Sequence, residues 1–128
     1  MHILIAADAD YVVNDLVQAL TGPDTSFTIC HEGRDVSPLV AERTPDLVIL
    51  DLQIGSMGGM AATMALRLDH SAGKAPDVKI LMLLDRAADI HLAKRSAANA
   101  WIVKPFDALT LQVAVNAALA ESEPIPAG

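Results

Sequence analysis

Short apolar runs alternate along the chain with longer stretches in which apolar residues recur at helical spacing. Each run is too short for a typical helix and is bounded by polar or turn-forming residues, so each predicts a buried strand. The five runs are residues 3–7, 27–30, 47–50, 80–84 and 101–103. Because successive positions in these runs are apolar, with Thr28 as the one polar residue, both faces of the sheet must be covered, which is typical of a parallel sheet.

Helical spacing predicts five helices between and after these strands. The first covers residues 12–20 and ends before Gly22 and Pro23, which are typical helix-stopping residues. The others are centred on residues 36–40, 60–68, 89–98 and 107–119, with Asp107 as the expected N-cap of the last. A strand–helix order repeated five times predicts a five-stranded parallel sheet with helices on both faces, a flavodoxin-like α/β architecture.

Length and charge narrow the class of protein. The 128 residues suffice for one domain, which we place at residues 1–121, with a polar tail or linker stub at 122–128. Nine Lys and Arg against sixteen Asp and Glu give a net charge of -7, which argues against nucleic acid as a partner. No signal peptide and no apolar stretch of about 20 residues is visible, so we expect a cytoplasmic protein without membrane contact.

Three charged residues follow three of the predicted strands. Asp8 follows the first, Asp51 the third and Lys104 the fifth. The carboxyl ends of parallel strands share one edge of the sheet, where ligands of this architecture bind. Carboxylate oxygens suit Mg²⁺, and a lysine ammonium suits phosphate oxygens, so the trio predicts a site for a hard cation and a phosphoryl group.

On these residues the chain resembles the receiver domain of two-component response regulators over about residues 2–120. The resemblance is carried by residues 3–8 (ILIAAD), 45–52 (PDLVILDL), 57–60 (MGGM) and 102–106 (IVKPF). It implies that a histidine kinase or phosphotransfer protein gives a phosphoryl group to Asp51. It also implies a Mg²⁺ site made by Asp8, Asp51 and the backbone carbonyl of Gln53.

The same resemblance implies roles near the end of the chain. Lys104 would bind a phosphoryl oxygen, and its bond to Pro105 would be cis. Trp101 stands where the family places an aromatic residue that moves inward on activation. The fourth helix, fifth strand and fifth helix would form a contact or homodimer face. Since no output domain is visible, the signal would pass to a separate effector protein.

The sequence also departs from the family pattern. Ala7 replaces the first of two consecutive acids, which should weaken Mg²⁺ binding. The family's Ser or Thr at the end of the fourth strand falls on Met82 by counting back from Lys104, or on Leu84 if the strand ends with its apolar run. Neither has a hydroxyl, so we place Leu84 at the switch position without the usual hydrogen bond.

These departures leave three interpretations open. The chain is an atypical receiver that still accepts phosphate, or a pseudo-receiver that binds its partner without phosphorylation. Neither would be an enzyme. The third is a phosphatase of haloacid-dehalogenase type, with Asp8 as nucleophile and Asp10 as general acid–base. This last interpretation is disfavoured because no Ser or Thr ends the strand at residues 80–84.

Overall fold

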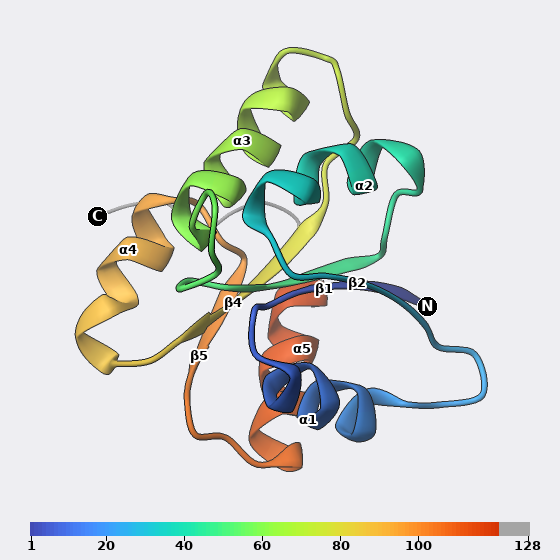
Figure 1. Ribbon diagram of the computed structural model, residues 1–128, viewed down its shortest axis with the longest axis vertical. Coiled ribbons are helices and arrows are strands. Elements are labelled where there is room, and N and C mark those ends of the chain that lie inside the picture. Colours follow the sequence, from blue (N-terminus) through green and yellow to red (C-terminus); the bar gives the residue numbers. More distant parts are fainter. Residues whose placement is uncertain (121–128) are drawn as a thin grey trace.

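The computed structural model describes residues 1–120 as one sheet between two layers of helices (Figure 1). The strands are β1 (His2–Ala6), β2 (Ser26–Cys30), β3 (Leu47–Asp51), β4 (Lys79–Leu84) and β5 (Ala100–Val103). All are parallel, in the order β2-β1-β3-β4-β5. The predicted α/β architecture is confirmed, with strand bounds shifted by one residue. The boundary at residue 121 and the tail at 122–128 lie outside the described residues.

Five helices connect or follow the strands. They are α1 (Asp10–Leu20), α2 (Val36–Glu42), α3 (Gly59–Ser71), α4 (Ile90–Arg95) and α5 (Ala108–Ala120). One face of the sheet carries α2, α3 and α4, and the other carries α1 and α5 (Figure 1). None of the helices within residues 1–120 is long and apolar enough to cross a membrane.

The fourth helix is shorter than the apolar spacing predicts. Residues 89–98 were expected to be helical, but Ala87–Asp89 form a 3₁₀ turn and α4 ends at Arg95. Ala97 has a φ of 66°, in the left-handed region, and the N–H of Ala98 donates to the carbonyl of Ala93 over 3.1 Å. A left-handed residue after the last turn commonly ends a helix, and it is usually glycine. Here the residue is Ala97, so the sequence does not indicate where the helix ends.

Alternate residues of each central strand enter separate halves of the core. Val48 and Leu50 of β3 pack with α2 and α3, whereas Leu47 and Ile49 pack with α1 and α5. All four are fully buried. Two helical layers therefore explain why β3 is apolar at successive positions instead of alternate ones.

The register brings the carboxyl ends of all five strands to one edge. Ala6 pairs with both Cys30 and Leu50, and Leu84 pairs with Val103. The residues that follow β1, β4 and β5, and the last residue of β3, therefore meet at this edge. β1 ends two residues before Asp8, because Ala6 is the last residue paired to a neighbouring strand.

Candidate functional site

Asp51 and Lys104 are in direct contact at the carboxyl edge of the sheet. Nζ of Lys104 donates to Oδ2 of Asp51 over 2.6 Å. The other carboxylate oxygen, Oδ1, accepts the backbone N–H of Gln53 at 3.0 Å. Asp51 is 5% exposed, so its carboxylate is held in place by two donors with little access to water.

A second carboxylate, Asp85, completes this ion cluster and was missed by the sequence analysis. Its Oδ1 lies 3.0 Å from Nζ of Lys104. Burial lowers the pKa of Lys104, but hydrogen bonds and charge from Asp51 and Asp85 outweigh burial and hold that pKa above its ordinary value. Asp85 directly follows the apolar run of β4, so the same rule that selected Asp8 could have found it.

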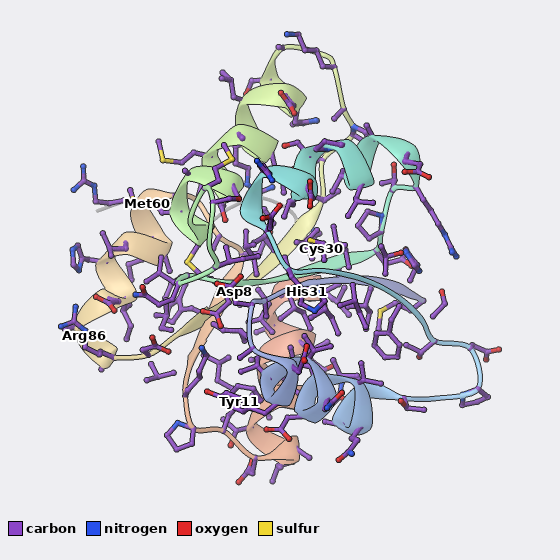
Figure 2. All side chains as sticks on the ribbon, in the orientation of Figure 1. Asp8, Tyr11, Cys30, His31, Met60 and Arg86 are labelled. Carbon is purple, nitrogen blue, oxygen red and sulfur yellow. The ribbon has the colours of Figure 1, made fainter. Side chains whose placement is uncertain are left out.

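The oxygen atoms proposed for Mg²⁺ are only partly assembled. Asp8 projects from the end of the β1 segment (Figure 2), and its Oδ2 accepts the N–H of Gly55 at 2.8 Å. Ala7 is buried and supplies no oxygen. Within residues 1–120 no three His, Cys, Asp or Glu side chains are grouped to hold a metal. The donors that remain are hard oxygen ligands of the kind Mg²⁺ prefers, in a smaller number than a strong site offers.

Asp10 is paired with a histidine and not with the ion cluster. It begins α1, and its Oδ1 lies 3.4 Å from Nε2 of His31 at a highly exposed position. Both Asp8 and His31 are labelled in Figure 2, at the carboxyl ends of β1 and β2. The pairing with His31 gives no support to Asp10 as a general acid–base acting beside Asp8.

The end of β4 places Leu84 next to Lys104. The backbone N–H of Lys104 donates to the carbonyl of Leu84 over 2.7 Å, and the Leu84 side chain is fully buried. Met82 instead pairs with Trp101, two residues earlier along the strand. Of the two positions considered for the missing hydroxyl, Leu84 is therefore the one at the site.

Trp101 and Pro105 lie before and after Lys104 in the chain. Trp101 is half-buried against the core, with Nζ of Lys94 5.7 Å from the centre of its ring system. That distance is within the range of a cation–π interaction. The Lys104–Pro105 peptide bond is cis, as the resemblance implies.

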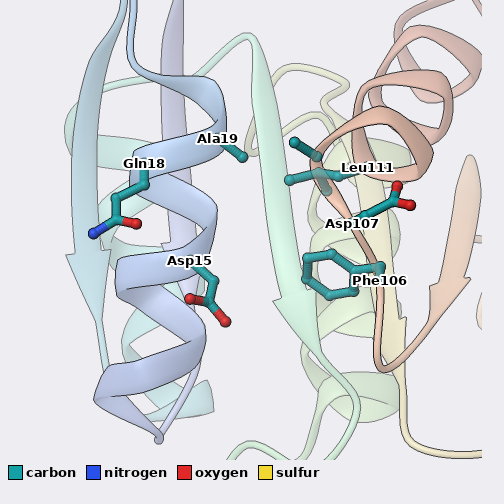
Figure 3. Close-up of a pocket in the computed structure, with 7 residues that line it drawn as sticks. Asp15, Gln18, Ala19, Phe106, Asp107 and Leu111 are labelled. Carbon is teal, nitrogen blue, oxygen red and sulfur yellow. The ribbon is translucent and has the colours of Figure 1, made fainter.

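A pair of pockets continues from the ion cluster along α1. The first, of about 310 Å³, is lined by Asp85 and Lys104 on one side and by Tyr11 and Asp15 on the other. The second, of about 400 Å³, lies between α1 and α5 (Figure 3). Both include Asp15 and Phe106, so they form one groove that opens beside Lys104. We refer to it as the α1–α5 groove.

Comparison with known proteins identifies the family. Residues 3–116 match the model of the response regulator receiver domain. The chain is 34% identical over 105 residues to the regulatory protein LuxO of Vibrio cholerae, covering 78% of this chain and 21% of LuxO. It is 31% identical over 128 residues to the DNA-binding response regulator MtrA of Mycolicibacterium smegmatis, covering 98% of this chain and 54% of MtrA. The chain thus spans about half, or less, of the length of these relatives.

Solved structures agree on the fold. The chemotaxis response regulator CheY4 of Vibrio cholerae superposes with a TM-score of 0.78 at 22% identity, covering 91% of this chain and 97% of CheY4. A LuxR-family two-component response regulator from Aurantimonas gives a TM-score of 0.80 at 23% identity, covering 98% of this chain and 89% of that one. With the family match over residues 3–116, the chain belongs to the response regulator receiver domains of two-component signalling.

Proposed function

We propose that this chain is an atypical receiver that takes a phosphoryl group from a histidine kinase or phosphotransfer protein onto Asp51, in the cytoplasm. The contact between Asp51 and Lys104 supports the proposal best. A nearly buried carboxylate beside a fixed ammonium combines a nucleophile with a counter-charge for a phosphoryl group. The signal would then pass to an effector by protein–protein contact.

The proposed reaction is an in-line displacement at phosphorus. A carboxylate oxygen of Asp51 forms the new O–P bond while the bond between phosphorus and the donor breaks, and the donor leaves with that electron pair. Lys104 pairs with the unphosphorylated Asp51 carboxylate over 2.6 Å. After the transfer, its ammonium would pair with a phosphoryl oxygen instead. Catalysis in such transfers is chiefly positioning and charge stabilisation, which this site can supply.

We propose that Asp8, Asp51 and the carbonyl of Gln53 hold Mg²⁺ weakly. When bound, the ion would offset the charge on the phosphoryl oxygens. Weak binding is expected because Ala7 replaces an acid and Oδ2 of Asp8 already accepts a hydrogen bond from Gly55. Uptake should therefore require a higher Mg²⁺ concentration than a site with three carboxylates would need.

The α1–α5 groove is a suitable contact surface for the phosphodonor. It opens beside Lys104, where Asp85 is part of its lining. Farther along, Asp15, Asp107 and the aromatic ring of Phe106 line it (Figure 3). A donor with Lys or Arg near its phosphohistidine would complement this charge. For an effector or a homodimer we keep the face of α4, β5 and α5, where Leu109 is 76% exposed and α5 carries no charged residue.

A pseudo-receiver is the second candidate. Two observations favour it: Leu84 offers no hydroxyl to a phosphoryl group, and Ala7 offers no carboxylate to a metal. In that case the chain would bind its partner without covalent modification. The two candidates differ in one measurable property, the formation of an adduct on Asp51.

The experiment is intact-mass analysis after incubation with acetyl phosphate and Mg²⁺, with Trp101 fluorescence read in parallel. One phosphoryl adduct that is absent in Asp51→Asn supports the receiver, and an accompanying change in fluorescence assigns Trp101 to the switch. The absence of both an adduct and a Mg²⁺ effect supports the pseudo-receiver. Uptake that survives in Asp51→Asn but is lost in Asp8→Asn, with Mg²⁺ still bound, would favour the phosphatase.

A further inference from the structure

The ammonium of Lys104 is shared between two carboxylates in the unphosphorylated chain. It lies 2.6 Å from Oδ2 of Asp51 and 3.0 Å from Oδ1 of Asp85. Only Asp51 is the proposed acceptor. We propose that Asp85 is a positioning residue that competes with the phosphoryl group for Lys104 and thereby limits how much phosphoryl group Asp51 retains. This inference rests on the proposed function.

The backbone positions of Asp85 and Lys104 bring their side chains together. Asp85 is the residue after Leu84, whose carbonyl accepts the N–H of Lys104 at 2.7 Å. Asp85 and Lys104 therefore leave adjacent strands at the same level, and their side chains meet without any long-range adjustment. Such a pair forms at little conformational cost, so the contact with Asp85 should be well populated.

The charges explain why the ion pair between Asp85 and Lys104 should affect phosphorylation of Asp51. Transfer to Asp51 replaces a carboxylate of one negative charge by an acyl phosphate that carries more. Lys104 must then face the phosphoryl oxygens, and the carboxylate of Asp85 would be held close to them. The Asp85 side chain is 47% exposed, so it can turn into water, but it loses its ion pair when it does. The free energy of the Asp85–Lys104 pair thus opposes phosphorylation.

The exposure of the two side chains sets how strongly the Asp85–Lys104 pair can oppose phosphoryl uptake. The Lys104 side chain is 18% exposed and that of Asp85 is 47% exposed, so solvent screens the pair partly. Half-exposed ion pairs contribute up to about 1 kcal/mol, which corresponds to roughly a fivefold change in an equilibrium. Neutralising Asp85 should therefore raise uptake at a limiting donor concentration by about two- to fivefold.

The test compares Asp85→Asn with Asp24→Asn. Both variants change net charge by one unit, but Asp24 is an exposed residue in the turn before β2. Among the described residues, Lys104 is within ion-pair distance only of Asp51 and Asp85. Each protein is incubated with Mg²⁺ and limiting acetyl phosphate, whose acyl O–P bond breaks as acetate leaves. We expect about two- to fivefold more adduct on Asp85→Asn than on wild type, and wild-type yield on Asp24→Asn.

Three outcomes separate this inference from the proposed function. Equal adduct on wild type and Asp85→Asn overturns the role of Asp85 and leaves the proposed function intact. No adduct on either protein overturns both. A gain of the same size in Asp24→Asn also overturns the inference, because net charge alone would then explain it.

Two further measurements test whether Asp85 acts through Lys104. In a Lys104→Met background, Asp85→Asn should no longer raise the yield, whereas a gain that persists shows direct repulsion of the phosphoryl group and overturns the competition. Without any phosphodonor, acetic anhydride should label Lys104 about two- to fivefold faster in Asp85→Asn, with exposed Lys74 as the internal standard. Unchanged labelling likewise overturns it.

Discussion

Gly59 begins α3 in backbone contact with Asp51. A Cβ atom at position 59 would lie 2.5 Å from the carbonyl oxygen of Asp51 and 2.6 Å from Cα of Leu52. The N–H of Gly59 also donates to the carbonyl of Leu52 over 3.0 Å. In the loop that follows Asp51, position 59 can therefore be occupied only by glycine.

We accordingly expect Gly59→Ala to destabilise the protein. The added methyl group must displace backbone atoms at the end of β3, which costs about 1–3 kcal/mol. Gly22→Ala is the matched control, because its Cβ would meet only Oγ1 of Thr25 at an ordinary 3.4 Å. Urea unfolding should show the loss in Gly59→Ala and a change within about 0.5 kcal/mol in Gly22→Ala. Equal midpoints in the two variants would contradict this packing.

Removing the ammonium of Lys104 should also destabilise the fold. Lys104→Met leaves the carboxylate of Asp51, whose side chain is 7% exposed, without its counter-charge. An uncompensated, nearly buried charge costs about 1–3 kcal/mol. Lys74→Met, at an exposed position, is the control for loss of a positive charge.

A double variant checks the cause of this loss. In an Asp51→Asn background there is no buried carboxylate to leave unpaired, so Lys104→Met should cost less than in the wild type. Chemical denaturation of the four proteins gives the coupling energy. If the cost of Lys104→Met is the same in both backgrounds, the ion pair is not the source of the stability.

Arg67 should be the strongest stabilising cation in the described part of the chain. Its guanidinium donates to the carbonyls of Ala97 (3.0 Å) and Val78 (2.8 Å), to Oδ1 of Asn99 (2.7 Å) and to Oδ1 of Asp77 (2.8 Å). Burial lowers the pKa of Arg67, while the charge and hydrogen bond of Asp77 oppose that shift. The group joins α3 to the amino-terminal ends of β4 and β5, opposite the edge that carries Asp51.

We expect Arg67→Met to lower the free energy of unfolding by about 2–4 kcal/mol, since it leaves several acceptors without donors. Arg67→Lys should recover little of this, because an ammonium cannot reproduce the planar fork of donors. Arg95→Met, at an exposed position on α4, serves as the control. Urea denaturation measures all three, and full recovery in Arg67→Lys would show that charge alone matters.

Stability should depend on the protonation of His2. The side chain is 7% exposed, and its ring nitrogens contact the hydroxyls of Ser26 and Thr28, both at 2.8 Å. Burial, followed by the positive charge of Arg43, lowers the pKa of His2 from 6.5. The unfolded chain therefore binds this proton more readily than the folded chain does, so protonation favours unfolding.

The contribution of His2 should be fully present above pH 6.5 and should be lost as pH falls from 6.5 towards the lower pKa of the folded state. Thermal unfolding measured between about pH 5 and 8 would show this loss as a melting temperature that decreases as the pH is lowered. The slope should be shallower in His2→Gln and unchanged in His91→Gln, which alters an exposed histidine. A wild-type slope retained in His2→Gln would assign the dependence to other groups.

Local sequence predicts the strands well here because each is a short run of mainly apolar residues, although β2 contains Thr28 and is only partly buried. All five runs became strands of the parallel sheet, and Asp107 caps α5 through a 2.7 Å bond from the N–H of Thr110 to its Oδ1. The fourth helix was predicted too long because its end depends on the positive φ of Ala97. An alanine carries no local signal for that conformation.

The alternation of strand and helix periods in the sequence therefore determined the layers, and with them the common edge at which Asp8, Asp51 and Lys104 were predicted to meet. Only the tertiary structure decided the strand order β2-β1-β3-β4-β5. This order puts β4 between β3, whose last residue is Asp51, and β5, which ends directly before Lys104. That order makes Asp85 the second partner of Lys104. Pairing between strands separated by tens of residues arises from side-chain packing across the whole core, which no local pattern records.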